Sequence, residues 1–302
     1  MAELEVAASA ERRAGQPERI AKAKTHRSAT AAHADPLWIR ALLIGIAVAF
    51  LGVMVIVPVA NIFSEALANG WPAYVDALKD EDSISALKLT LTVAAIVVPL
   101  NAVFGLAAAW AITKFDFAGK SILVTLIDLP LAVSPVVAGL IFLLIFGQQG
   151  YLGPWLLDHG IEVVFALPGI VIATLFVTFP LVARALIPVM EELGRDYEEA
   201  AVSLGASGWQ TFWQVTLPGS KWGLLYGVIL CNARAMGEFG AVAVISGKIT
   251  GKTDTLPLRI DKLNSGFDTT SAFALASLLV GLALITLLLR LAVEWRTGRR
   301  AL

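Results

Sequence analysis

The sequence predicts an all-α membrane protein with six transmembrane helices and both termini in the cytoplasm. Of its 302 residues, 57% are hydrophobic and only 16% are charged, whereas soluble domains carry about 25% charged residues. A chain of this size cannot bury so much apolar surface in its own core, so we expect the surplus to face lipid. The apolar residues also gather in long runs, and about 20 of them in a row can cross the hydrocarbon core as a helix.

Six apolar runs are long enough to span a bilayer, interrupted mainly by Pro and Gly residues that membrane helices tolerate. They cover residues 38–62, 86–112, 121–146, 165–189, 222–245 and 271–293. Trp38, Trp110, Trp222 and Trp295 lie near run ends, where aromatic side chains anchor helices at the membrane interface. Together the runs predict one transmembrane domain over residues 38–295, in contact with membrane lipid.

Residues 1–37 and 296–302 flank this domain and are expected to be cytoplasmic tails. The N-terminal tail is mixed in charge and lacks the early apolar stretch of a secretory signal, so it is expected to be disordered or a frayed helix. It holds His26 and His33, which we interpret as solvated. Cys231 is the single cysteine, which leaves no internal disulfide and no cysteine metal cluster. We expect no metal, no cofactor and no nucleic-acid partner.

Basic residues beside the runs set the expected orientation, because cytoplasmic loops carry an excess of Lys and Arg. The N-terminal tail is rich in both, and the second connection holds Lys114 and Lys120, whereas residues 147–164 have neither Lys nor Arg. The loop between the fourth and fifth runs is therefore expected in the cytoplasm. The expected outer loop 246–270 departs from this rule because it is basic. It could meet an acidic partner or an anion. Its basic residues are Lys248, Lys252, Arg259 and Lys262.

The cytoplasmic loop 191–220 predicts two short helices joined by a turn. Tyr197 to Leu204 is rich in helix formers, and Gly205 offers a break because glycine readily adopts positive φ. Ser207 could cap a second segment with apolar residues at helical spacing, and Pro218 is expected to end it before the membrane. An anionic lipid surface would repel the acidic first half, so we favour a basic protein partner over a helix lying on lipid.

The stretch from Glu199 to Pro218 resembles the EAA motif of binding-protein-dependent ABC importer permeases. That motif reads E-A-A, three residues, G, nine residues and I-x-L-P, and the chain departs from it only with Val215 in place of Ile. The resemblance implies a coupling helix that docks on a separate ATPase, with Glu199 meeting a basic residue there. Nucleotide-driven closure of two ATPase copies would then reorient the membrane helices. The coupling residues implied by the match are Glu199, Ala200, Ala201, Gly205, Leu217 and Pro218.

Two further segments resemble oxyanion importers for sulfate, thiosulfate and molybdate. They are RAMGEFGA at 234–241 and DLPLAVSPVVAGL at 128–140, while residues 246–258 most resemble the W-type subunit of the sulfate/thiosulfate permease. The resemblance implies a bacterial inner-membrane complex with a sister permease as heterodimer partner, two copies of an ATPase and a periplasmic solute-binding protein. Molybdate or tungstate import, through a permease that is more often a homodimer, stays an alternative.

Two charges interrupt the fifth run. Arg234 lies deep in it, where an uncompensated charge costs at least about 2.5–3.5 kcal/mol, and Glu238 follows on the same helix face. They could form an internal ion pair, or they could line the pathway, with Arg234 offering its guanidinium to an oxyanion. Both interpretations stay open.

The remaining pathway candidates are Gly237, Asp128, Pro130 and Pro135. Gly237 and the nearby Gly240 favour close helix packing. The two prolines can bend the third helix, and broken helices often line cavities. Asp128 could pair with Arg184, whose side chain could equally reach the membrane interface.

The segment 247–253 resembles a phosphate-binding loop but has three residues between its glycines, where that pattern requires four. The chain is therefore not expected to hydrolyse ATP or to be an enzyme. An ATPase-independent secondary transporter is a rival interpretation, but inverted repeats, which would favour it, are not evident. A membrane anchor is another rival, although it has no need for charges within the membrane.

Overall fold

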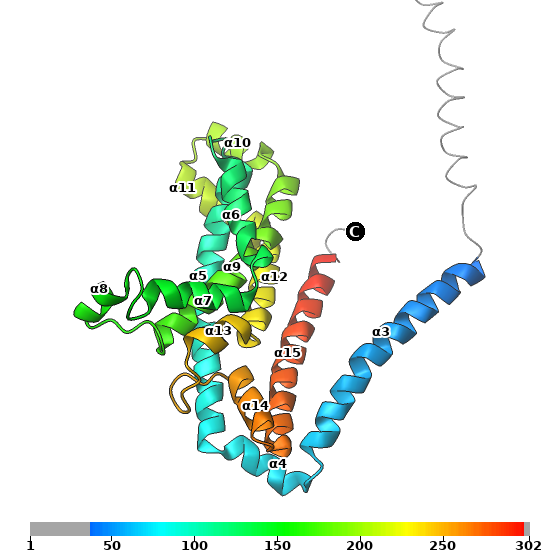
Figure 1. The fold of residues 1–302 in the computed structure, drawn as a ribbon. Coiled ribbons are helices and arrows are strands. Elements are labelled where there is room, and N and C mark those ends of the chain that lie inside the picture. The colour runs from blue at the N-terminus through cyan, green and yellow to red at the C-terminus, as the bar shows by residue number, and fades with distance from the viewer. Residues whose placement is uncertain (1–36, 299–302) are drawn as a thin grey trace, which may run out of the picture. The chain divides into compact units, whose positions relative to one another are not determined.

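The computed structural model describes residues 37–298, in which every regular element is a helix (Figure 1). This confirms the all-α prediction for that range. The expectations for the tail up to residue 36, with His26 and His33, and for residues 299–302 lie outside the described residues. The described residues divide into two compact parts, 37–58 and 59–298, and each is treated by itself.

Four of the six predicted runs form single helices of membrane-spanning length and composition. The first run becomes α3 (Leu37–Ala66), which stays helical through Pro58. The other three become α5 (Glu81–Lys114), α9 (Leu167–Leu193) and α15 (Thr269–Gly298). These four crossings are therefore present as helices that could span a bilayer.

The third run is sharply bent, as its prolines lead one to expect. It forms α6 (Lys120–Ala132) and α7 (Pro135–Phe146), which meet at 107°. Pro135 occupies the first turn of α7, where the missing N–H leaves no hydrogen bond unmade, whereas Pro130 lies inside α6. The bend therefore belongs to Pro135, and the pair counts as a fifth candidate span only if both halves form one crossing.

The fifth run is not one continuous helix, so that prediction was wrong. It divides into α12 (Leu217–Met236) and α13 (Gly240–Ile245). The break follows from Glu238, whose Oε1 accepts a hydrogen bond of 3.0 Å from the backbone N–H of Ala241. A carboxylate in that position satisfies an N–H that a helix start leaves free. The described residues thus contain four candidate spans, or five with the bent pair.

The core of the second part is built from α5, α9 and α12, which pack against one another. Glycine permits the closest crossing, because a Cβ added to Gly105 of α5 would lie 2.7 Å from Cβ of Val182 on α9. A Cβ on Gly240 would similarly lie 2.9 Å from Cβ of Pro135, whereas Gly237 has only carbonyls of its own helix within 4 Å. Close packing therefore applies to Gly240 and not to Gly237.

Short helices gather at the two ends of this bundle (Figure 1). At one end lie α10 (Asp196–Ser203), α11 (Gly208–Thr211) and the π-helical turn η1 (Phe212–Thr216). At the other end lie α4 (Gly70–Lys79) and α14 (Leu256–Ser265), while α8 (Gly153–Asp158) follows α7. With 34 residues, α5 is about 50 Å long and joins the two ends.

Candidate functional site

The loop 191–220 folds as a helical hairpin, as its sequence predicts. After α10 the chain turns at Gly205, which has φ +92°, a conformation that favours glycine. Ser207 then caps α11 reciprocally: its N–H donates to Oε1 of Gln210 (2.8 Å), and the N–H of Gln210 donates to its Oγ (3.3 Å). Such a capping box fixes where the second helix begins.

Pro218 does not end the second segment, so that expectation was wrong. The chain continues from α11 through η1 into α12, with Leu217 and Pro218 in the first turn of α12. In the π-helical turn the N–H of Leu217 bonds to the carbonyl of Phe212, five residues back. This turn shifts the hydrogen-bond register, so that the missing N–H of Pro218 falls where a new helix tolerates it.

The outward surface of the hairpin combines apolar and acidic side chains. Leu204 is 90% exposed and Trp209 is 69% exposed, and the ring of Trp209 lies 5.6–5.9 Å from the rings of Phe212 and Trp213. Glu199 and Ala200 are exposed on α10, and Ala201 is partly buried. Exposed apolar patches of this kind mark interaction surfaces.

The inward side of the hairpin is tied to the end of α5. Nζ of Lys114 lies 3.3 Å from Oε1 of Glu198 and also donates to the carbonyl of Gly194. The hydroxyl of Thr216 donates to the same Oε1. We call Lys114, Glu198, Thr216 and the Gly194 carbonyl the hairpin anchor.

A second tie joins the hairpin to the loop between α5 and α6. The guanidinium of Arg195 donates to Oδ2 of Asp116 (3.2 Å). That hydrogen bond, together with the charges of Arg195 and Lys120, holds the pKa of Asp116 below its ordinary value. Beside the anchor, a pocket of about 500 Å³ is lined by residues that include Trp110, Glu199 and Phe212.

The two charges of the fifth run are paired. The Arg234 guanidinium lies 3.1 Å from Oε2 of Glu238, without the alignment of a hydrogen bond. Glu238 is buried, with 1% of its side chain exposed, whereas 45% of the Arg234 side chain is exposed. The ion-pair interpretation is therefore confirmed, and part of the guanidinium remains accessible to other groups.

The other pathway candidates occupy two places. Pro135 lies against Gly240, and Gly240 follows Glu238 of the charge pair closely in the sequence. Asp128, on α6 with Pro130, accepts a hydrogen bond of 2.7 Å from Nε of Arg184 on α9. The possible pairing of Asp128 with Arg184 is thus realised, and it joins α6 to α9.

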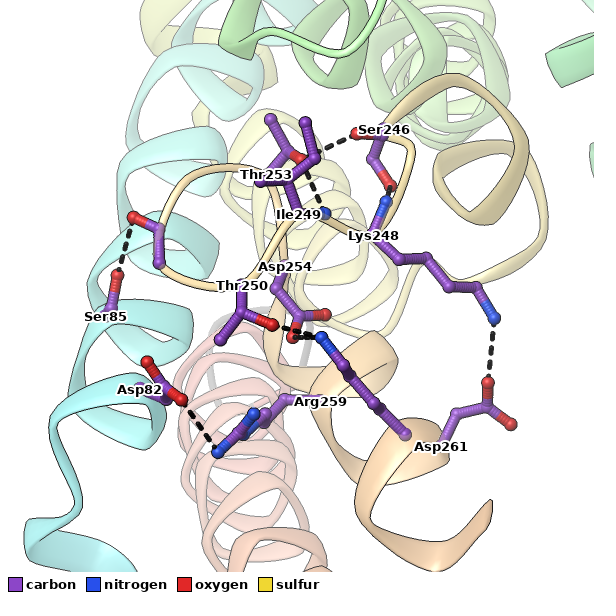
Figure 2. Close-up of polar contacts among 12 residues, drawn as sticks. Asp82, Ser85, Ser246, Lys248, Ile249, Thr250, Thr253, Asp254, Arg259 and Asp261 are labelled. Atoms are coloured by element: carbon purple, nitrogen blue, oxygen red, sulfur yellow. Dashed lines mark hydrogen bonds and ion pairs between the residues drawn. The ribbon is translucent and has the colours of Figure 1, made fainter. Parts of the chain in front are cut away.

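Most basic residues of the loop at the opposite end are paired with carboxylates, some in the loop and α14 and others at the start of α5 (Figure 2). Lys248 lies 2.9 Å from Asp261, and Arg259 lies 3.2 Å from both Asp80 and Asp82. Lys262 donates to Thr250 and lies 3.9 Å from Asp254. These contacts explain how a basic loop can be stable without an acidic partner or a bound anion.

The same loop is fastened to the first turns of α5. The hydroxyl of Ser85 donates to the carbonyl of Gly251 (3.2 Å), and the N–H of Leu256 donates to the hydroxyl of Thr90 (2.8 Å). With the contacts of Arg259, they hold α14 against α5. The two ends of α5 therefore carry two separate polar clusters, the hairpin anchor and this loop.

Asp254 is the least satisfied charged group among the described residues of the basic loop. Its side chain is buried, and neither carboxylate oxygen accepts a hydrogen bond. Burial raises the pKa of Asp254; Lys262, Arg259 and Lys248 oppose this effect and Asp82 adds to it. A raised folded-state pKa adds stability below the ordinary value of 3.8, and that stability is lost as pH rises through the folded pKa.

Asp254→Asn is therefore expected to raise the melting temperature at pH 7 by about 2–4 °C, which corresponds to about 1 kcal/mol. The gain should shrink towards pH 4, where the wild-type carboxylate becomes protonated. Thermal unfolding of the purified protein in detergent at both pH values measures it. Asp261→Asn is the matched control, because Asp261 is partly exposed and paired with Lys248. A lower melting temperature for Asp254→Asn at pH 7 would show that the charge is stabilising.

Sequence reasoning missed the hairpin anchor and the buried state of Asp254. In the sequence, Lys114 indicated only which side of the membrane its loop faces, and Glu198 was one of several acidic residues in the first half of the loop 191–220. Their contact joins residues that lie far apart in the sequence, and no local spacing reveals such a pair. One available signal was a lysine placed directly at the end of a long apolar run.

Comparison with known proteins identifies the family. Residues 101–299 match the family described as "Binding-protein-dependent transport system inner membrane component". The chain belongs to this family. Members are components of the inner membrane, which agrees with the predicted localisation and with the apolar helices of the structure.

Several curated proteins are similar to this chain over most of their length. The sulfate transport system permease protein CysW of Synechococcus elongatus is 51% identical over 86% of this chain and 91% of its own length. CysW of Escherichia coli K12 is 48% identical over 86% of this chain and 89% of its own. The permease protein CysT of the same strain is 37% identical over 86% of this chain and 94% of its own.

Solved structures of a bacterial ABC transporter that imports alginate share the fold. One superposes with a TM-score of 0.70 at 16% sequence identity, covering 87% of this chain and 96% of the solved chain. Another contains the transporter together with an alginate-bound periplasmic protein and gives a TM-score of 0.69 at 17% identity. At this identity the likeness establishes that the chain shares the fold of a chain of this transporter.

Proposed function

We propose that the chain is the permease subunit of an ABC importer that carries sulfate or thiosulfate across the bacterial inner membrane. ATP hydrolysis on a separate ATPase subunit drives it. The observation that carries this proposal is the exposed hairpin: it presents Glu199 and an apolar patch on the pattern E-A-A, G and L-P, at one end of a helix bundle. The names of the CysW relatives support the choice of substrate.

The importer would contain a sister permease, two copies of the ATPase and a periplasmic solute-binding protein. The identity to CysW is 48–51% and that to CysT is 37%, so this chain would take the W-type place beside a T-type partner in a heterodimer. The periplasmic protein bound in the alginate importer supports the last component.

The transmembrane domain would cover residues 38–295 with six crossings and both termini in the cytoplasm. The crossings would be α3, α5, the bent pair α6–α7, α9, α12 with α13, and α15. The loop 191–220 would then face the cytoplasm. The basic loop, which lies at the opposite end of α5, would face outward.

We place Arg234, Gly237, Glu238, Asp128, Pro130 and Pro135 beside the anion pathway. The accessible part of the Arg234 guanidinium can meet a dianion through charge-assisted hydrogen bonds. Glu238 pairs with the same guanidinium and keeps the net charge near zero. An anion would then bind briefly rather than remain trapped.

Arg234→Gln is expected to lower the maximal rate of sulfate transport about tenfold, because a lost charged hydrogen bond typically has that effect. Uptake of radiolabelled sulfate by cells that carry the complete importer measures it. Lys221→Gln is the control, since Lys221 is an exposed cation near the start of the same helix. Normal transport by Arg234→Gln would remove Arg234 from the pathway.

The proposed function is tested by deleting the gene for this chain from its host and then restoring it. Restoration should recover uptake of radiolabelled sulfate, and excess unlabelled thiosulfate should compete. Competition by molybdate alone, with no sulfate uptake, would support a molybdate importer with the same architecture. Uptake that continues after the ATPase subunit is deleted would contradict the proposal.

A further inference from the structure

We propose that the hairpin anchor is the link through which the ATPase-docking loop moves the membrane helices, with Lys114 and Glu198 as its positioning residues. This rests on the proposed function, because it assumes that the hairpin docks on an ATPase. It goes further because it assigns the transmission of motion to the carboxylate of Glu198, whereas the carboxylate of Glu199 docks on the ATPase. It also names the helix that receives the motion.

Two adjacent glutamates of α10 have different surroundings. Glu199 is exposed and faces a prospective partner, whereas Glu198 is partly buried, with 18% of its side chain exposed, and accepts contacts from within the chain. Consecutive residues of a helix point about 100° apart, at 3.6 residues per turn. The helix α10 can therefore bind the partner through the carboxylate of Glu199 and contact the membrane domain through that of Glu198.

A single oxygen of Glu198 collects contacts from several elements. Lys114 is the last residue of α5, and Thr216 directly precedes α12. Lys114 also donates to the carbonyl of Gly194, which directly follows α9. The ends of three packed core helices thus meet at the hairpin anchor, two of them by direct contact with Glu198 and the third through Lys114, so a displacement of α10 reaches all three.

The anchor is better shielded than the other polar tie of the hairpin. Only 7% of the Lys114 side chain is exposed, compared with 44% for Arg195 and 76% for Asp116 in the second tie. Exposed ion pairs are weakened by solvent and salt. The ring of Phe212 also lies 4.8 Å from that of Trp110 on α5, but an apolar contact can slide. The shielded charge pair of Lys114 and Glu198 is therefore the contact best able to make α5 move in the same direction as α10.

Motion delivered to Lys114 enters a helix that continues to the far end of the bundle. There, Asp82, Ser85 and Thr90 of α5 hold Arg259, Gly251 and Leu256 of the outer loop and α14. Rigid secondary elements carry coupling over such distances when they have two arrangements. Through α5, the anchor connects the docking hairpin to the loop at the opposite end.

The test uses the complete importer, purified in lipid nanodiscs, with wild-type or Lys114→Met permease. Three quantities are measured: copurification of the ATPase, basal ATP hydrolysis, and hydrolysis stimulated by sulfate-loaded binding protein. Lys114→Met should leave copurification and basal ATP hydrolysis unchanged. It should reduce the stimulation by sulfate-loaded binding protein about tenfold, which is within the usual range of coupling between sites. Lys114→Arg should restore most of it. Lys120→Met is the control, because Lys120 pairs with exposed Asp116.

Several outcomes separate this inference from its rivals. Full stimulation with Lys114→Met would overturn it, and so would loss of ATPase copurification, which would make the anchor a determinant of assembly. If Lys114→Met does not fold, Glu198→Gln keeps the shape of the side chain and must show the same selective loss. A wild-type complex that contains no ATPase would instead contradict the proposed function itself.

Discussion

Glu199→Lys is expected to lower ATP-driven transport at least about tenfold, because like charges placed together at an interface are strongly unfavourable. Glu199 is exposed on α10 and lines the pocket that the hairpin forms with the end of α5. The proposed ATPase would meet it with a basic residue, and the substitution would set two cations against each other. Copurification of the ATPase and uptake of radiolabelled sulfate measure the effect.

The matched control for this prediction is Glu192→Lys, the same change at an exposed residue in the last turn of α9, before α10 and the residues of the E-A-A motif. It should leave copurification and transport close to wild type. Both variants should melt at the wild-type temperature, since neither side chain is buried. A Glu199→Lys importer that keeps its ATPase and its transport rate would remove Glu199 from the docking surface.

Gly105→Val is expected to destabilise the bundle by about 3 kcal/mol or more, at the upper end of overpacking effects. A Cβ at this position would lie 2.7 Å from Cβ of Val182 and 3.1 Å from the backbone N of Ala183. Neither atom belongs to the far end of a flexible side chain, so α5 and α9 would have to separate. Yield and melting temperature in detergent should both fall.

Gly281→Val is the control for the packing prediction, because nothing lies within 4 Å of a Cβ added at Gly281 of α15. It introduces the same side chain into another membrane-length helix and should leave the melting temperature of the isolated chain nearly unchanged. Equal melting temperatures for Gly105→Val and the wild type would show that α5 and α9 do not cross as closely as described.

The membrane-length helices were accessible to sequence reasoning because their signal is local. Runs of about 20 apolar residues specify helices by length and composition, and four of the six appear as single helices. The hairpin was also predictable, since Gly205 and Ser207 act on their immediate neighbours. The docking role proposed for Glu199 came from the resemblance to a known motif.

The wrong or missing predictions concern places where tertiary contacts or an irregular turn override the local sequence pattern. Pro218 predicts a helix end by its missing N–H, but the π-helical turn before it accommodates the proline. The fifth run looked continuous by composition, yet buried Glu238 bonds to the start of a new helix at Ala241. The hairpin anchor was invisible, because Lys114 and Glu198 meet only when α5 and the hairpin are already in place.

The measurement that most directly tests the central claim is ATP hydrolysis by the native complex, purified through this chain and placed in lipid nanodiscs. Sulfate-loaded binding protein is added in one case and molybdate-loaded binding protein in the other. The account predicts that an ATPase copurifies and that sulfate stimulates its activity while molybdate does not. A complex without ATPase activity would contradict the assignment of residues 191–220 as a coupling loop.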